Sequence, residues 1–125
     1  MTASRHIAIV GAGMAAVTCA RTLVQAGHRV TVFEKSHTVG GRMATRNSAF
    51  GTFDTGAQYF TVRDPRFVQA LQTAPTVCKR WSANTVQVLD DHGRVAAAGL
   101  PAREPHWVAS PGMSALVRRW AQPLA

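Results

Sequence analysis

A glycine-rich turn directly after a short apolar run constrains the fold of this chain more than any other feature. The run covers residues 7–10, and it leads at once into Gly11-Ala12-Gly13-Met14-Ala15-Ala16, which has the form GxGxxA. Consecutive apolar residues of this kind indicate a strand that is buried on both faces, as in a parallel sheet. Gly11 permits a tight turn out of the strand, and Gly13 has no Cβ to keep a pyrophosphate away from the backbone. The motif therefore predicts a strand, a phosphate-binding turn and a helix.

The residues after the turn extend this unit to a second strand. Apolar residues recur at helical spacing up to Val24, and Gly27 is placed where a left-handed residue ends a helix. The free N–H groups of the first helical turn are then expected to face the phosphates. Residues 29–33 alternate toward Glu34, which lies where a carboxylate at the end of the second strand accepts hydrogen bonds from a ribose. No arginine follows Glu34 directly, which favours a ribose without a 2′-phosphate, as in FAD or NAD.

A second glycine segment follows the acid. Val39-Gly40-Gly41-Arg42-Met43 combines paired glycines, which allow a close approach to a ligand, with an arginine that can neutralise phosphate charge. The glycine turn, Glu34 and this segment together resemble the FAD-binding start of amine-oxidase-like flavoproteins. The predicted fold class is α/β, with a Rossmann-type FAD-binding βαβ unit of the amine-oxidase-like flavoprotein fold and a partial β-rich extension. Residues 1–75 are expected to form the FAD/NAD(P)-binding unit, and residues 76–125 to begin a substrate domain with a hairpin and a helix.

A closer resemblance is to the renalase family. It rests on Gly41-Arg42-Met43-Ala44-Thr45-Arg46, on Phe53-Asp54-Thr55-Gly56-Ala57-Gln58-Tyr59-Phe60-Thr61 and on Pro111-Gly112-Met113-Ser114-Ala115-Leu116, in this order. The resemblance implies bound FAD and hydride transfer to the flavin from a reduced nicotinamide dinucleotide or an amine, with oxygen as the electron acceptor. The residues expected to contact the cofactor are Gly11, Ala12, Gly13, Met14, Ala15, Glu34, Lys35, Gly41, Arg42, Met43, Gly56, Ala57, Gln58 and Tyr59. No residue is assigned a catalytic role.

The chain is much shorter than the members of that family, which carry further elements that complete the flavin site. A chain of 125 residues is expected to correspond to their N-terminal portion only. A truncated, non-catalytic nucleotide-binding fragment is therefore the alternative to an active oxidoreductase. A Rossmann unit that binds NAD alone is a third reading, and the segments around Gly41 and Gln58 argue against it.

Composition excludes several other classes of protein. The net charge of +8 comes from scattered basic residues rather than a basic run, so no nucleic-acid partner is expected. The histidines and the two cysteines form no ligand pattern, so no metal site is expected, and Cys19 and Cys78 are expected to be buried or free thiols. No secretory signal and no apolar run long enough for a membrane span is present, so cytoplasmic residence is expected. The sequence leaves the oligomeric state and the identity of the small-molecule substrate open.

The remaining segments give a coarser set of expectations. Residues 44–48 are expected to form a loop and residues 53–56 the end of a short strand, with Asp54 capping a turn rather than acting as a base. Asp64 and Pro65 indicate the start of a helix that ends near residues 73–75. Residues 86–89 and 94–96 are expected to pair as a hairpin, residues 99–105 to form a loop and residues 107–108 a strand. Ser110 and Pro111 are expected to cap a last helix that continues to Trp120.

Overall fold

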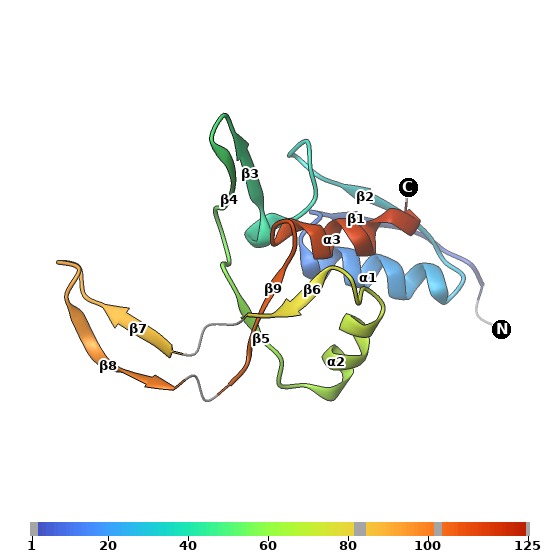
Figure 1. The fold of residues 1–125 in the computed structure, drawn as a ribbon. Helices are drawn as coiled ribbons and strands as arrows, with labels where there is room; N and C mark the ends of the chain where they lie inside the picture. Colours follow the sequence, from blue (N-terminus) through green and yellow to red (C-terminus); the bar gives the residue numbers. More distant parts are fainter. Residues whose placement is uncertain (1–2, 82–84, 102–103, 125) are drawn as a thin grey trace.

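The predicted strand–helix–strand unit is present at the start of the chain. The structure, a computed structural model, describes residues 3–81, 85–101 and 104–124 (Figure 1). Strands β1 (His6–Val10) and β2 (Arg29–Phe33) pair in parallel, and helix α1 (Met14–Gln25) connects them. Helix α1 ends as predicted: Gly27 has φ +87°, its N–H donates to the carbonyl of Val24, and the N–H of His28 donates to that of Leu23. These two bonds satisfy the carbonyls of Leu23 and Val24 in the last turn of the helix.

The segment expected to be a loop at residues 44–48 is instead a strand. Strand β3 (Thr45–Ser48) forms an antiparallel hairpin with β4 (Gly51–Asp54), so the loop prediction was wrong. The tight turn between them explains the pairing, because Gly51 has φ +132° and the Ser48 hydroxyl donates to the Gly51 carbonyl. The end of β4 lies where residues 53–56 predicted the end of a strand.

A small antiparallel sheet and helix α2 follow. Helix α2 (Pro65–Gln72) begins as predicted, with the Asp64 carboxylate accepting a hydrogen bond from the Arg66 N–H. Strand β9 (His106–Ala109), predicted at residues 107–108, is the central strand of a sheet in the order β5–β9–β6. Its partners β5 (Phe60–Thr61) and β6 (Cys78–Arg80) come from either side of residue 75.

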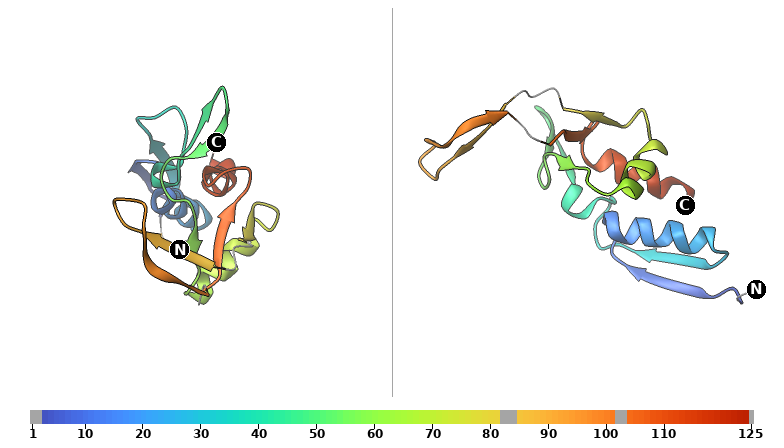
Figure 2. Two further views of the ribbon diagram at one scale, coloured as in Figure 1. Left: turned by 60° about the vertical axis from the view of Figure 1, so that its left-hand side comes forward. Right: turned by 90° about the horizontal axis from the view of Figure 1, so that it is seen from below.

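A second hairpin projects from the rest of the molecule. Strands β7 (Thr85–Leu89) and β8 (Val95–Pro101) pair antiparallel, as predicted, and extend away from the helices (Figures 1 and 2). Strand β8 continues to Pro101, so the loop predicted for residues 99–105 was wrong over residues 99–101. Residues 102–103 of the predicted loop lie outside the described part of the chain.

The core lies where α1, α2 and α3 meet the β5–β9–β6 sheet. Helix α3 (Ser114–Ala121) packs beside α1, and Met113, Leu116, Val117 and Trp120 are almost fully buried (Figure 1). The helix begins three residues later than predicted, because its N-cap is Met113 rather than Ser110. The Met113 N–H donates to the Asp54 carboxylate and the Ser114 N–H donates to the Thr45 hydroxyl. Asp54 also accepts a bond from the Thr45 hydroxyl, so it joins the first hairpin to α3.

The β1–β2 pair leaves apolar surface exposed. Val10 at the end of β1 is 87% exposed and Phe33 at the end of β2 is 56% exposed.

Short 3₁₀ turns at Gly41–Met43 (η1) and Gln122–Leu124 (η2) complete the described secondary structure. Within residues 3–81, 85–101 and 104–124, no helix has the length and apolar character to cross a membrane.

Candidate functional site

A crevice of about 600 Å³ opens where β1 and β2 end. It is bordered by the glycine turn after β1, by the residues that follow β2 and by the start of η1. Its lining residues are Val10, Gly11, Ala12, Gly13, Phe33, Glu34, Lys35, Ser36, Thr38, Val39, Gly41 and Ala44. In open α/β sheets, ligands bind outside the carboxyl ends of the strands, which is the position of this crevice.

The Glu34 carboxylate is held in the crevice by two backbone N–H groups. Its Oε2 accepts a hydrogen bond from the Ala12 N–H at 2.6 Å, and its Oε1 accepts one from the Ser36 N–H at 3.0 Å. These two bonds, that of Ser36 first and that of Ala12 second, lower the pKa of Glu34 below its usual value. An ionised carboxylate accepts about four hydrogen bonds, so both oxygens keep capacity for the hydroxyls of a ligand. Glu34 is therefore a fixed, charged acceptor.

The glycines of the two loops shape the crevice in different ways. Gly11 has φ +99°, its N–H donates to the Phe33 carbonyl, and a Cβ at this position would meet open space. Gly13 and Gly41 are in backbone contact instead, because a Cβ on Gly41 would lie 3.1 Å from the Gly13 Cα. Gly40, which is not among the residues predicted to contact the cofactor, has φ +143° and donates its N–H to the Ala12 carbonyl. The paired glycines thus hold the second loop directly against the first.

The start of α1 borders the glycine turn and offers backbone donors. Gly13 is the N-cap residue, no side chain of the described residues caps the helix, and its first turn contains no acid. The Ala12 N–H is taken by Glu34. The donors for an anion are therefore the N–H groups at the helix start, at Met14 and Ala15, together with the positive end of the helix dipole.

Residues 55–57 pack beneath the loop that carries Arg42. The Ala57 N–H donates to the Arg42 carbonyl at 2.8 Å. Gly56 lies so close that a Cβ there would overlap the Arg42 carbonyl oxygen and approach its carbon to 2.7 Å. The Met43 side chain is buried in the core and the Arg42 side chain is exposed. Gly56 and Ala57 therefore set the position of Arg42 from outside the crevice.

Gln58 and Tyr59 lie apart from the crevice lining. The Tyr59 ring stacks on His106 with the ring centroids 4.1 Å apart, and it lies 6.1 Å from the ring of Trp81. Gln58 is exposed, and so is the Lys35 side chain at the mouth of the crevice. Of the residues predicted to contact the cofactor, the structure thus brings six together in the crevice lining: Gly11, Ala12, Gly13, Glu34, Lys35 and Gly41.

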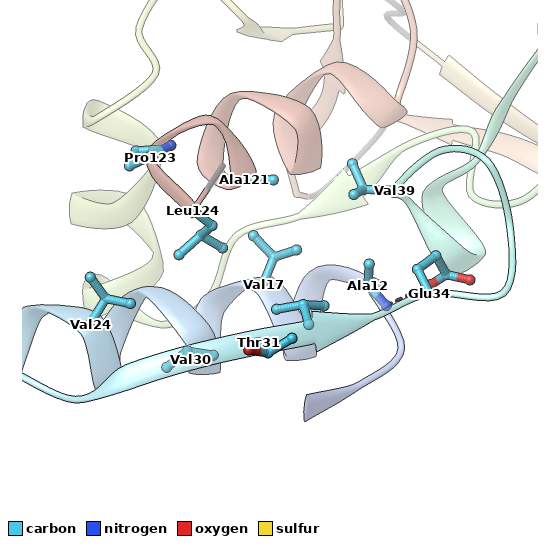
Figure 3. Close-up of a pocket in the computed structure, with 11 residues that line it drawn as sticks. Ala12, Val17, Val24, Val30, Thr31, Glu34, Val39, Ala121, Pro123 and Leu124 are labelled. Atoms are coloured by element: carbon cyan, nitrogen blue, oxygen red, sulfur yellow. Dashed lines mark hydrogen bonds between the residues drawn. The ribbon is translucent and has the colours of Figure 1, made fainter. Parts of the chain in front are cut away.

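A second cavity lies beside the crevice, between α1, β2 and η2. Figure 3 shows its side chains and the hydrogen bond between Ala12 and Glu34 at one end. Its volume is about 440 Å³, and its walls are formed mainly by apolar side chains such as Val17, Val24 and Leu124. Among the residues that the structure describes, Glu34 is the single charged residue in its lining, so the described walls offer no cation to a phosphate. The glycine crevice is the part suited to a diphosphate.

Comparisons with known proteins agree with the fold of this βαβ unit. Residues 9–74, just over half of the chain, match the family described as NAD(P)-binding Rossmann-like domain. An L-amino-acid oxidase of Siganus canaliculatus is 38% identical over 97 residues, which cover 71% of this chain and 16% of that protein. A 4,4'-diapophytoene desaturase (4,4'-diaponeurosporene-forming) of Staphylococcus haemolyticus is 45% identical over 58 residues, covering 46% of this chain and 12% of the relative.

Solved structures give the same fold. A putrescine oxidase solved with putrescine bound superposes with a TM-score of 0.57 and 24% sequence identity, over 82% of this chain and 22% of that one. The chain thus spans less than a quarter of the length of each of these relatives. The family match over residues 9–74 includes the glycine turn, α1, β2, Glu34, β3, β4 and α2. The chain belongs to the NAD(P)-binding Rossmann-like domain family.

Proposed function

We propose that this chain is the FAD-binding unit of a renalase-type oxidoreductase. In this proposal the turn formed by Gly11, Ala12 and Gly13 seats the pyrophosphate, the N–H groups of Met14 and Ala15 donate to it, and Glu34 binds the ribose of the adenosine. Arg42 supplies a cation on the phosphate side. The observation that carries the proposal is that the glycine turn and the Glu34 carboxylate, 21 positions beyond Gly13 in the sequence, share one crevice.

The residues of the crevice fit a dinucleotide. Gly11 leaves open space where a side chain would stand, and the two oxygens of Glu34 keep acceptor capacity after binding Ala12 and Ser36. A crevice of about 600 Å³ is within the usual range of 300–1,000 Å³ for small-molecule sites. The Gly40-Gly41-Arg42 loop favours FAD over NAD alone, because Gly41 approaches the phosphate turn closely and the exposed Arg42, which follows it directly in the sequence, adds a cation to the loop.

The reaction proposed is oxidation of a reduced nicotinamide dinucleotide or an amine, in which a bound flavin would accept the hydride and oxygen would take up the two electrons and be reduced to hydrogen peroxide. When bound, the flavin supplies the hydride acceptor. The chain's own residues bind and orient the cofactor, and none is assigned a proton transfer. The names of the relatives, an L-amino-acid oxidase and a putrescine oxidase, support a small amine-bearing substrate.

The second candidate is a nucleotide-binding fragment without turnover. The observation that favours it is the small share of the relatives that the chain covers, 16% of the amino-acid oxidase and 22% of the putrescine oxidase. Such a fragment would bind the ADP half of the cofactor in the glycine crevice and would not retain the flavin ring.

The experiment is an absorbance scan of the purified protein, followed by mass spectrometry of the small molecule that heat releases and by calorimetric titration with FAD and with ADP. The proposal expects a flavin spectrum and FAD in the released material. It also expects Glu34→Gln to weaken ADP binding about tenfold, the loss typical of a charge-assisted hydrogen bond.

Glu104→Gln is the matched control, because Glu104 is exposed and pairs with Arg63 outside the crevice. It should leave ADP binding unchanged. ADP binding without flavin retention selects the fragment. If the folded protein binds neither ligand, or if Glu34→Gln and Glu104→Gln behave alike, the assignment of the crevice is wrong.

A further inference from the structure

A separate cavity lies between α2 and the β5–β9–β6 sheet. Its volume is about 450 Å³, and none of its lining residues lines the glycine crevice. The lining consists of Val62, Val68, Leu71, Gln72, Pro75, Cys78, Arg80, Pro105 and Trp107. Most of these side chains are apolar, and the volume is that of a site for a small organic ligand.

The strand register explains why these residues meet. Arg80 on β6 lies opposite Trp107 on β9, and Trp107 lies opposite Phe60 on β5, so the three side chains stand on one face of the sheet. Cys78 is two residues before Arg80 and shares this face. Phe60 contacts Phe67 of α2 with ring centroids 5.8 Å apart, which shows that this face is turned toward the helix.

The cavity has an apolar floor and a polar rim. Leu71 and Cys78 are 6% and 7% exposed, and burial raises the pKa of the Cys78 thiol to about 11, so the floor carries no charge at neutral pH. Arg80 and Gln72 are exposed and supply the N–H donors at the rim. A ligand that fits both parts has an apolar body and an anionic head.

The charges around the cavity favour an anion. Two acids lie close in sequence to lining residues: Asp64 near Val62, and Glu104 next to Pro105. Both are already paired, Asp64 with Arg66 at 2.6 Å and Glu104 with Arg63 at 3.0 Å. Among the residues that the structure describes, Arg80 has no acidic partner within ion-pair distance. Its guanidinium is therefore available to a carboxylate, which it can bind through two parallel N–H donors.

From this arrangement we propose that the cavity between α2 and the β5–β9–β6 sheet binds an apolar carboxylate, such as a medium-chain fatty acid. The hydrocarbon chain packs against Leu71, Cys78 and Trp107, and the carboxylate accepts hydrogen bonds from Arg80 and Gln72 at the rim. This site is independent of the proposed nucleotide site, so its test stands whether or not the chain binds FAD.

The test is a titration of the 15N-labelled full chain with octanoate, followed by NMR, and a parallel titration with octan-1-ol. Octanoate should shift the indole N–H of Trp107 and the side-chain amide of Gln72, and it should leave the backbone N–H signals of Gly11 and Gly13 in place. Octan-1-ol has the same apolar chain without the charge, so it should bind about fivefold more weakly, the upper range for an exposed ion pair.

Two variants and a matched control separate the effect of the Arg80 charge from that of the cavity. Arg80→Gln should weaken octanoate binding about fivefold and leave octan-1-ol binding unchanged. Lys79→Gln is the matched control, because Lys79 is the neighbouring cation on the opposite face of the same strand, and it should change neither. Val68→Trp, which places a large ring in the cavity wall, should abolish binding of both ligands.

Three outcomes would overturn the proposal. In the first, octanoate shifts no resonance of the cavity lining. In the second, octanoate and octan-1-ol bind the unaltered chain equally well, a comparison that requires no variant to fold. In the third, Lys79→Gln weakens octanoate binding as much as Arg80→Gln does.

Discussion

Replacing Gly56 by alanine tests whether residues 55–57 set the position of the loop that carries Arg42. The Gly56 backbone has no left-handed requirement, so the effect of an added methyl group is purely steric. That methyl group would overlap the Arg42 carbonyl oxygen and would lie 2.7 Å from its carbon. Both are backbone atoms and cannot turn aside as a side chain would. Either the loop or residues 55–57 must move.

The expected cost follows from two contributions. Overpacking against a fixed backbone costs about 1–3 kcal/mol. Loss of the hydrogen bond from Ala57 to the Arg42 carbonyl adds about 1 kcal/mol. We expect Gly56→Ala to lower the free energy of unfolding by about 2–4 kcal/mol, which shifts the urea midpoint by roughly 1–3 M for a slope of ~1.5 kcal/mol/M.

The matched control is Gly27→Ala. Gly27 has φ +87° and open space around its Cβ position, so alanine there meets torsional strain of about 1–2 kcal/mol without a clash. Urea unfolding followed by circular dichroism measures both variants. Gly56→Ala should be the more destabilised, and it should also weaken ADP binding, because Gly41 in the same loop contacts Gly13. Equal midpoints, or a Gly56→Ala variant as stable as the unaltered chain, would refute the reasoning.

Three further predictions concern stability and thiol chemistry. At pH 8, iodoacetamide should label Cys19 rapidly and Cys78 slowly, because burial raises the pKa of Cys78 to about 11 while Cys19 is exposed; mass spectrometry of tryptic peptides measures both rates. Asp54→Ala should lower the free energy of unfolding by about 1–3 kcal/mol, because it leaves the buried Met113 N–H unpaired, whereas Asp54→Asn keeps an acceptor and should cost less. The hydrogen bonds from the side chain and backbone of Arg66 lower the pKa of Asp64 from 3.8 to about 2. The stability they contribute is present above pH 3.8 and is lost as the pH falls toward 2, so the difference in urea midpoint between the unaltered chain and Asp64→Asn should close over that window.

Local sequence determines the parts of the fold that were predicted correctly. The apolar run, the glycine turn, the helical spacing and Gly27 all act within a few residues, and they place β1, α1 and β2 as found. The start of α2 is equally local, because its cap is the residue directly before the helix. Where neighbouring residues all favour the same secondary structure, periodicity and capping rules are sufficient to predict it.

The segments predicted wrongly depend on contacts between distant residues. Helix α3 begins at Ser114 because Asp54 and Thr45, more than fifty positions earlier, accept its first N–H bonds. Strand β3 has a polar, small-residue sequence that carries little strand signal, and it exists because β4 pairs with it. Pairing with Thr85 likewise extends β8 to Pro101. No pattern within those segments contains this information.

In the candidate site too, features set by neighbouring residues could be predicted from the sequence, and contacts between loops could not. The glycine motif and the spacing to Glu34 located the crevice, since both are read along one βαβ unit. The contact between Gly13 and Gly41 was not predictable, because it joins two loops and depends on the absence of a Cβ on both. The paired glycines at 40 and 41 were the available signal, and their role in holding one loop against another emerges only from the arrangement in space.

The β7–β8 hairpin offers a place to attach a reporter. It contacts little besides itself and stands away from the crevice, and its turn at Asp90–Gly93 is exposed (Figure 2). Exposed turns of this kind accept inserted sequence without disturbing the domain that carries them. A fluorophore or affinity peptide placed at Asp91 would therefore immobilise or track the protein while leaving the glycine crevice and the α2 cavity in their native form.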